Sequence, residues 1–260
     1  MELDGHPATA DQIAALALRN YGHFTSMRVE GSAVRGLSLH LERLVRDCRT
    51  LHGAELDPER VRQCVRSAVA KIEQPAVVRV TIFDPALDLG HPGGVAEPHV
   101  LVSARQAPPG MLAPMKLQSV IYQRDLPSVK HVGLFGPVYL RRTAQLDGYD
   151  DVLFVDTAKQ VIEGATWNIG FYDGERVIWP ESDCLPGVTM RLLQASTASA
   201  GWTSASTTLA QLEGMRAAFI TNAAIGVRPV ESIDTLTFPG DPEIVQALQN
   251  EYTAIKGEPL

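Results

Sequence analysis

Two runs of β-forming residues flank an Asp-Gly pair in the second half of the chain, and this pattern limits the fold more than any other feature. The stretch 162–180 reads IEGATWNIGFYDGERVIWP, with Asp173 and Gly174 at its turn. An Asp-Gly pair between such runs is a strong short-range signal for a β-hairpin. Elsewhere helical and strand patterns mix without strict β-α-β alternation. The sequence therefore predicts a mixed α+β protein and disfavours a doubly wound parallel sheet.

The first half predicts a small α/β domain. Residues 23–37 indicate two strands joined at a turn, and Ser38 is expected to cap an amphipathic helix that ends at Gly53. A second helix is expected from Pro58 to about residue 72, because Asp57-Pro58 is a typical helix start. Strands follow at 76–84 and 98–106. The apolar stripe of the first helix consists of Leu37, Leu41, Leu44 and Cys48.

A Pro- and Gly-rich segment divides the chain. We predict a domain over residues 1–108, a linker at 109–114 and a second domain over 115–260. The second domain is expected to contain strands, the hairpin, a helix that begins near Pro186-Gly187 and a closing helix over 241–255.

Composition excludes several classes of function. With 260 residues and 45% hydrophobic residues, the chain is expected to be soluble and globular. The net charge of −7 argues against a nucleic-acid surface. No apolar run is long enough to span a bilayer, and the start of the sequence does not resemble a signal peptide. The three cysteines form no CxxC and no metal spacing, which favours a reducing compartment, the cytoplasm.

Glu163 is a carboxylate without a basic residue close to it in the sequence. It ends an apolar run, and no basic residue lies within three positions on either side. A buried carboxylate without a partner is unfavourable, so Glu163 either faces water or meets a cation.

Three further features point to chemistry only when they are combined. Lys130 stands among apolar neighbours, where a lysine tends to lose its proton and can form a Schiff base, although on spacing alone a lysine extending into solvent is the better reading. Val188 and Thr189 follow Gly187 at a helix start, which favours an anion such as phosphate, although a plain helix start is the better reading of this feature alone. Arg43 lies on the polar helix face, where a surface arginine or a pair with Asp47 is the ordinary reading.

Together these residues describe one ligand, pyridoxal phosphate (PLP). This cofactor needs a lysine for its aldehyde, a group that tunes its ring nitrogen and a phosphate site. Glu163 would then meet a pyridinium cation. The sequence has no GxGxxG after a strand, no Walker lysine, no HExxH and no GxSxG, which excludes four common alternatives.

At this point the sequence resembles a known family, the class IV aminotransferases or fold type IV PLP enzymes. This family includes branched-chain and D-amino-acid aminotransferases and aminodeoxychorismate lyase. Four stretches carry the resemblance, in the family's order: GHFTSMRV…LHLERL, VKHVGLFGPVYLRRTAQLDGYDDVLFVD, IEGATWNIGFYDGERVIWP…LPGVTMRLL and AAFITNAAIGVRPVESID.

The resemblance implies a role for each matching residue. Lys130 matches the Schiff-base lysine, Glu163 the acid on the pyridine nitrogen, and Arg43 a phosphate-binding arginine. Val188 and Thr189 match the phosphate-binding helix start. The resemblance also implies a small N-terminal α/β domain, a larger C-terminal domain with a barrel-like sheet, PLP in the cleft, and a homodimer.

Two departures from the family pattern bear on the reaction. Phe135 stands where branched-chain enzymes carry a tyrosine, and the lyase and D-amino-acid branches also lack this tyrosine. Ala223 stands where many aminotransferases place a threonine hydroxyl on the phosphate, so that backbone N–H groups of Asn222 and Ala223 would serve instead. The Asn-Ala pair, the KH at Lys130 and the FTS around Thr25 resemble the lyase.

The substrate pocket is predicted from three residues, Thr25, His131 and Trp167. Trp167 is expected to cover a cofactor face, with a core tryptophan as the ordinary alternative. The leading function is a PLP-dependent aminotransferase that acts on an amino acid or related amine. Aminodeoxychorismate lyase and an inactive scaffold homologue stay open, and the retained Lys130, Glu163 and Arg43 weigh against the scaffold.

Overall fold

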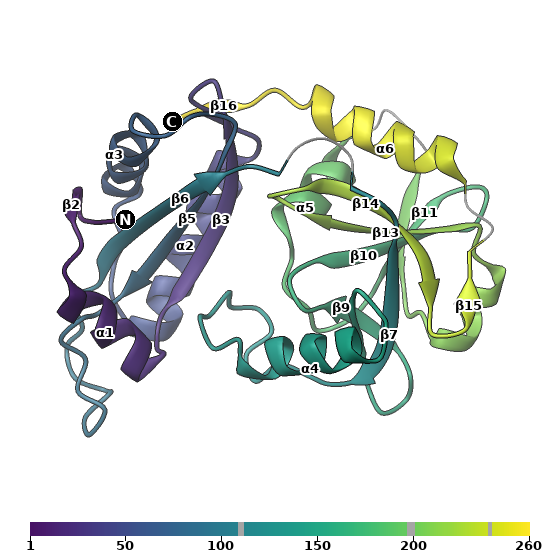
Figure 1. Cartoon of the computed structure of the whole chain (residues 1–260), viewed down its shortest axis with the longest axis horizontal. Coiled ribbons are helices and arrows are strands. Elements are labelled where there is room, and N and C mark those ends of the chain that lie inside the picture. The colour runs from purple at the N-terminus through teal and green to yellow at the C-terminus, as the bar shows by residue number, and fades with distance from the viewer. Residues whose placement is uncertain (109–111, 197–200, 239–240) are drawn as a thin grey trace. The chain divides into compact units, whose positions relative to one another are not determined.

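The polypeptide passes more than once between two compact units (Figure 1). The computed structural model of the chain describes residues 1–108, 112–196, 201–238 and 241–260. The first unit comprises Met1–Pro108, Val129–Gly133 and Lys256–Leu260, and the second comprises Pro109–Ser128 and Leu134–Ile255. Residues 109–111 of the predicted linker lie outside the described residues.

The described strands of the first unit form one antiparallel sheet. Its order is β16-β4-β3-β5-β6-β1-β2. The long central strands pair along their whole lengths, with Thr25 opposite Val80 and Arg79 opposite Ser103. The strands are β1 (Glu2–Leu3), β2 (His6–Pro7), β3 (His23–Glu30), β4 (Ala33–Val34), β5 (Ala76–Phe83), β6 (His99–Gln106) and β16 (Glu258–Pro259).

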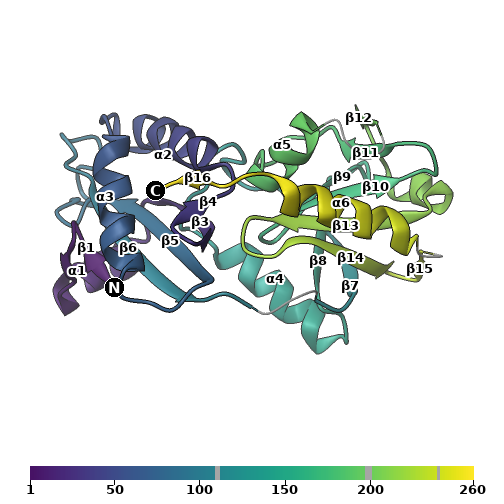
Figure 2. The same cartoon turned by 90° about the horizontal axis from the view of Figure 1, so that it is seen from above.

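Helices α2 (Leu37–His52) and α3 (Pro58–Val69) cover one face of this sheet (Figure 2). Their apolar stripes join the inward-facing valines of the strands in one buried core, which confirms the stripe predicted for the first helix. Asp57 caps α3 as predicted, by accepting a hydrogen bond from the Glu59 N–H at 2.9 Å. Helix α1 (Ala10–Arg19) packs on Phe83 and Leu101, which point to the opposite face.

The predicted cap of α2 is wrong. The helix begins one residue earlier than Ser38, after Gly36 in the left-handed conformation (φ 67°). Ser38 lies inside the first turn, where its N–H and hydroxyl donate to the Glu258 carboxylate at 2.9 and 3.0 Å. A side chain from the far end of the sequence thus bonds the residue that was expected to cap the helix.

The described strands of the second unit form a mixed sheet. Its order is β12-β11-β10-β13-β14-β7-β8-β9, with β15 on β14. The β7–β8, β7–β14 and β11–β12 pairs are parallel and the other pairs are antiparallel. The strands are β7 (Met115–Ile121), β8 (Asp151–Val155), β9 (Val161–Gly164), β10 (Asn168–Tyr172), β11 (Val177–Pro180), β12 (Trp202–Ala205), β13 (Ala217–Asn222), β14 (Gly226–Ile233) and β15 (Leu236–Thr237).

This sheet curls round an apolar core. Val161 of β9 and Phe171 of β10 share the core with side chains from β7, β13 and β14. The Gly164 N–H also donates to the Trp167 carbonyl at 2.9 Å, which joins the end of β9 to the start of β10. The mixed α+β architecture with a partial barrel agrees with the predicted fold class. The predicted hairpin is present as β10 and β11.

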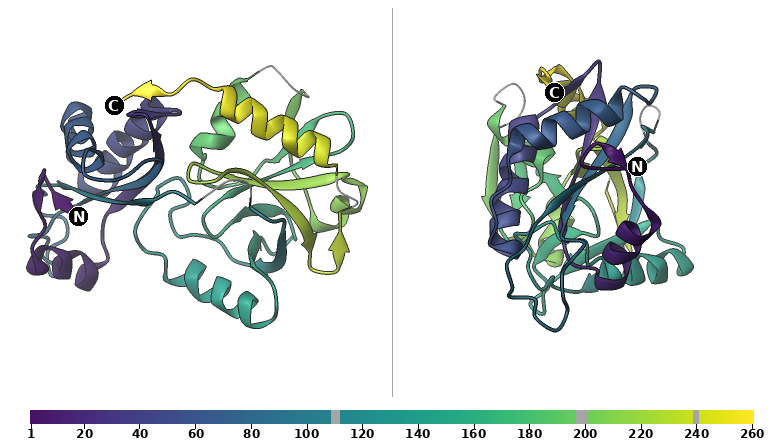
Figure 3. Two further views of the ribbon diagram at one scale, coloured as in Figure 1. Left: turned by 45° about the horizontal axis from the view of Figure 1, so that its top comes forward. Right: turned by 90° about the vertical axis from the view of Figure 1, so that its left-hand side faces the viewer.

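Helices α5 (Val188–Ala195) and α6 (Pro242–Ala254) pack on the outside of the curled sheet (Figure 3). Phe219 of β13 and Leu193 of α5 belong to the apolar layer beneath them. Helix α4 (Phe135–Leu146) packs on β8, and a 3-10 helix spans Leu209–Gly214. None of the helices in the described parts is both long and apolar enough to cross a membrane.

Candidate active site

Lys130 is held by its backbone in the first unit. Its N–H donates to Asp47 Oδ2 at 3.0 Å, and its carbonyl accepts the Phe24 N–H at 2.8 Å. Two residues further on, the Val132 N–H donates to the Gly22 carbonyl at 2.9 Å, so the segment lies along the edge of β3. The Lys130 ammonium nitrogen is 4.9 Å from the centre of the Phe24 ring. Asp47 is fully buried and also pairs with Arg46 at 2.7 Å.

Arg43 and Thr25 are bonded to each other inside the first unit. Arg43 is 5% exposed, and its Nη2 donates to Thr25 Oγ1 at 2.5 Å. Thr25 Oγ1 also lies 2.7 Å from Nδ1 of the buried His40. Arginine only donates, so Thr25 Oγ1 accepts from Arg43, and His40 Nδ1, which lies 3.4 Å from the same Nη2, is also an acceptor. The Thr25 hydroxyl therefore donates its own proton to His40 Nδ1. The Thr25 hydroxyl thus makes its hydrogen bonds to other side chains of the first unit.

His40 is neutral in this arrangement. Accepting at Nδ1 requires its proton to be on Nε2. Burial, together with the charges of Arg43 and Lys130, holds the pKa of His40 well below its usual range. His40 therefore serves Thr25 as a fixed acceptor across the physiological pH range.

His131 adjoins Lys130 and forms an isolated β-bridge with His23. Its ring lies against Gly133, where a Cβ would be 3.1 Å from His131 Nδ1. The structure therefore places Thr25, Arg43, Lys130 and His131 in the same unit, around β3. Their predicted roles toward cofactor and substrate stay predictions.

Glu163 does meet a cation, and that cation is Arg124 of the second unit. Arg124 Nε donates to Glu163 Oε1 at 2.6 Å, and both side chains are nearly buried. Arg124 Nη2 also donates to the Gly164 and Ala165 carbonyls at 3.1 and 2.8 Å. The second carboxylate oxygen accepts the Leu185 N–H at 3.4 Å.

The turn that contains Leu185 connects Glu163 with the start of helix α5. The Leu185 carbonyl accepts from Asn168 Nδ2 at 2.8 Å. Asn168 lies against Gly187, the N-cap of α5, where a Cβ would be 2.1 Å from Asn168 Oδ1. A side chain at this position would force the Asn168 amide to shift. Burial and the Glu163 carboxylate raise the pKa of the neighbouring Cys184 to about 11, so this thiol stays protonated.

Val188 and Thr189 are the first two residues of α5, and both are buried. Gly187 provides no side-chain cap. Within the described residues Thr189 Oγ1 has no hydrogen-bond partner. A helix start with unsatisfied N–H groups and such a hydroxyl favours an anion.

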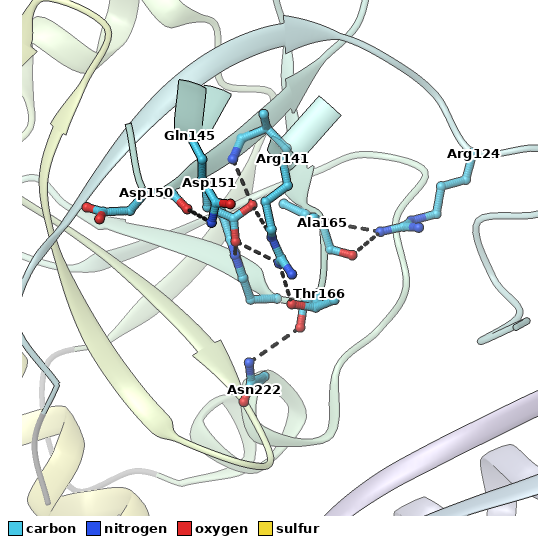
Figure 4. Close-up of polar contacts among 11 residues, drawn as sticks. Arg124, Arg141, Gln145, Asp150, Asp151, Ala165, Thr166 and Asn222 are labelled. Atoms are coloured by element: carbon cyan, nitrogen blue, oxygen red, sulfur yellow. Dashed lines mark hydrogen bonds and ion pairs between the residues drawn. The ribbon is translucent and has the colours of Figure 1, made fainter. Parts of the chain in front are cut away.

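Trp167 lies in the core of the second unit. It is 4% exposed, and its indole N–H donates to Asp151 Oδ2 at 2.8 Å. Arg141 of α4 binds the same carboxylate at 2.8 and 2.7 Å and also donates to Thr166 Oγ1 at 2.8 Å (Figure 4). The Thr166 carbonyl in turn accepts from Asn222 Nδ2 at 3.4 Å.

Asn222 shapes the turn that holds Ala223. Its Oδ1 accepts the N–H groups of Ala224 and Ile225 at 3.0 and 3.1 Å. Glu163, Trp167, Thr189, Asn222 and Ala223 thus belong to the second unit, and Arg141 joins α4 to the 165–167 segment and, through it, to this turn. The cofactor contacts predicted for these residues stay predictions.

A family model described as amino-transferase class IV matches residues 22–233. This match covers most of the chain. The chain belongs to the class IV aminotransferases. The assignment confirms the family predicted from the four sequence stretches, a family of PLP-dependent enzymes. A comparison with curated protein sequences found no match.

Solved structures share the fold of this class IV aminotransferase. The branched-chain amino acid aminotransferase of Escherichia coli superposes with a TM-score of 0.83 at 17% identity, covering 98% of this chain and 91% of that one. A hypothetical aminotransferase from Mycobacterium tuberculosis in a PLP-bound form has a TM-score of 0.79 at 20% identity, covering 96% and 94%. A putative 4-amino-4-deoxychorismate lyase from Legionella pneumophila has a TM-score of 0.78 at 22% identity, covering 95% and 96%.

Sequence reasoning missed Arg124, His40 and Asp47. Arg124 lies 39 positions before Glu163, well outside the three-residue window in which a basic partner was sought. The available signal was chemical, because a buried carboxylate requires a cation from somewhere in the chain. Asp47 was considered only as a partner of Arg43 within the helix.

Proposed function

We propose that this class IV aminotransferase binds PLP and transfers an amino group between an amino acid, or a related amine, and a 2-oxo acid. One observation carries the proposal most directly. The buried Glu163 carboxylate lies beside the turn that leads into α5, whose Thr189 hydroxyl has no partner among the described residues. This arrangement supports the proposal, because the cofactor needs an acid for its ring nitrogen and a site for its phosphate.

The chain's own groups fit the parts of the cofactor. The Lys130 amine is the group for the aldehyde, and Glu163 is the acid that holds a proton on the pyridine nitrogen. Arg43 and the first turn of α5, with Val188 and Thr189, would hold the phosphate, assisted by the N–H groups of Asn222 and Ala223.

Bound PLP supplies an electron-withdrawing ring that acidifies the Cα–H of an attached amino substrate. The role of Lys130 in the reaction is to accept that proton as general base and to return it. Phe24 and Asp47 limit the movement of this lysine, since they hold its backbone on both sides. Arg124 holds the Glu163 carboxylate in place, because it binds Oε1 together with the Gly164 and Ala165 carbonyls, and Glu163 would be the acid for the ring nitrogen.

Aminodeoxychorismate lyase is the second candidate. It is favoured by Asn222-Ala223 at the turn, by Phe135 in place of a tyrosine, and by the FTS and KH pairs. The same proton abstraction by Lys130 would then lead to release of pyruvate and p-aminobenzoate.

We also propose that the enzyme is a cytoplasmic homodimer. Phe135, Val138, Tyr139 and Leu146 of α4 are exposed apolar side chains, which supports an interface with a second copy. The three cysteines are all free thiols, which supports a reducing compartment. Light scattering on the purified protein tests the dimer.

A screen of single amino donors tests cofactor and reaction together. The purified protein is expected to be yellow, and a true donor is expected to convert the bound cofactor to its pyridoxamine form. Pyruvate and p-aminobenzoate from aminodeoxychorismate, without conversion by any donor, would favour the lyase. Colourless protein that cannot be reconstituted with PLP would contradict both and support an inactive scaffold.

A further inference from the structure

A second buried hydroxyl in the second unit is left without a partner. Thr221, the penultimate residue of β13, is 1% exposed, and no described residue bonds its Oγ1. Thr189 at the start of α5 is 0% exposed and has the same property. A buried hydroxyl without a hydrogen bond destabilises the folded state. Two such hydroxyls in the same layer therefore indicate an acceptor from outside the chain.

The two hydroxyls belong to the same layer of the unit. Side chains alternate along a strand, so Thr221 and Phe219 of β13 point to one face of the sheet. Phe219 packs in the apolar layer that includes Leu193 of α5. Thr221 therefore faces the side of the sheet that α5 covers.

The register places Thr221 at the end of that layer where α5 begins. Thr221 is the cross-strand partner of Asn168 on β10, and directly opposed side chains share a face. The Asn168 side chain lies against Gly187, the N-cap of α5. Thr221 thus lies beside Asn168, whose side chain contacts the N-cap of α5.

We propose that Thr221 donates its hydroxyl hydrogen to the phosphate of the cofactor, in place of the hydroxyl that Ala223 lacks. This inference rests on the proposed function. Thr189, Thr221 and the first N–H groups of α5 form one oxyanion site. Its hydroxyl contact comes from residue 221, two positions before the Ala223 position that supplies a threonine hydroxyl in many aminotransferases. The turn at Ala223 then contributes backbone N–H groups only.

Binding to the full-length apoenzyme tests the assignment with Thr221→Val, which removes the hydroxyl and keeps the shape. Thr221→Ser restores the hydroxyl. Thr207→Val is the matched control, since Thr207 is equally buried but donates to the Ala205 carbonyl at 3.0 Å. The readouts are the Kd for PLP, the Kd for pyridoxal, which has no phosphate, and the rise in melting temperature caused by inorganic phosphate.

Thr221→Val is expected to weaken PLP binding by about tenfold or more, the size of one hydrogen bond to a charged group. Pyridoxal binding is expected to stay unchanged, and the phosphate-induced rise in melting temperature to shrink. Thr221→Ser and Thr207→Val are expected to bind PLP like the wild type. Equal PLP affinity of Thr221→Val and wild type would overturn the inference and leave the proposed function standing. A wild type that binds no PLP would contradict both.

Discussion

Arg124 Nε lies 2.6 Å from Glu163 Oε1, and the two side chains are only 12% and 5% exposed. The acid expected to meet a cofactor nitrogen is therefore already joined to a guanidinium of its own unit. The same guanidinium bonds the Gly164 and Ala165 carbonyls. Arg124 thus pairs with the Glu163 carboxylate and also bonds the backbone that follows it.

Arg124→Gln is expected to lower the free energy of unfolding by about 3–5 kcal/mol, because it leaves a buried carboxylate unpaired. Chemical denaturation measures the loss. Arg142→Gln, an exposed arginine of α4, is the charge-matched control and is expected to change the stability by less than about 0.5 kcal/mol. Equal stability of the two variants would show that the Arg124–Glu163 pair contributes nothing to folding.

Trp167→Phe separates a core role from a role in substrate binding. The change removes the indole N–H bond to Asp151 and part of a buried ring, so the stability is expected to fall by about 2–4 kcal/mol. If the ring is a core element, KM for the amino donor stays unchanged. Trp202→Phe is the control at an exposed tryptophan. A raised KM with unchanged stability would instead support the predicted pocket role of Trp167.

Local signals predicted the elements that depend on local chemistry. The hairpin at 173–174 formed because Asp173 Oδ1 accepts the N–H groups of Glu175 and Arg176, both at 2.8 Å, and Gly174 adopts a φ of 109°. The apolar stripe of α2 likewise follows from helical spacing alone. These features require no knowledge of the rest of the chain.

Local sequence patterns do not predict contacts between segments that lie far apart along the chain. Ser38 lost its predicted capping role to Gly36 and is bonded by Glu258, which lies 220 positions away. Arg124 follows β7 and Glu163 lies on β9, and these two strands flank β8, so the contact depends on the order of strands in the sheet. Thr25 lies on β3, where His23 to Thr25 are buried without alternation, so the period of the strand gives no indication of which side faces a pocket.

Thr25→Val is expected to destabilise the protein by about 2–4 kcal/mol, because Arg43 and His40 both lose their hydrogen bond to a buried hydroxyl. We also expect weaker PLP binding, since the Arg43 guanidinium is no longer fixed. Thr25→Ser keeps the hydroxyl and is expected to recover both properties. Denaturation and PLP titration measure the two effects. A variant that changes only KM for the substrate would support a direct substrate contact by Thr25.

His23 makes the stability depend on pH. Burial, with smaller effects of the charges of His52 and Arg43, lowers the pKa of His23 to about 3. Below about pH 6.5 the unfolded chain binds a proton that the folded protein does not, so stability falls as the pH falls, by up to about 1.4 kcal/mol per pH unit for one histidine. His23→Leu is expected to reduce this loss between about pH 6 and 4 by the share of one histidine, while the share of the buried His40 remains. The exposed His6→Gln is expected to leave the loss unchanged. Denaturation curves at several pH values measure the free energy of unfolding of each variant. An equal loss of stability at low pH in both variants would contradict the role given to His23.

The central claim, that the Lys130 amine holds the cofactor, is tested most directly by reducing the purified enzyme with borohydride and mapping its peptides by mass spectrometry. The account predicts a phosphopyridoxyl group on the peptide that contains Lys130, and none in Lys130→Ala. A label on any other lysine, or unchanged labelling of Lys130→Ala, would contradict it.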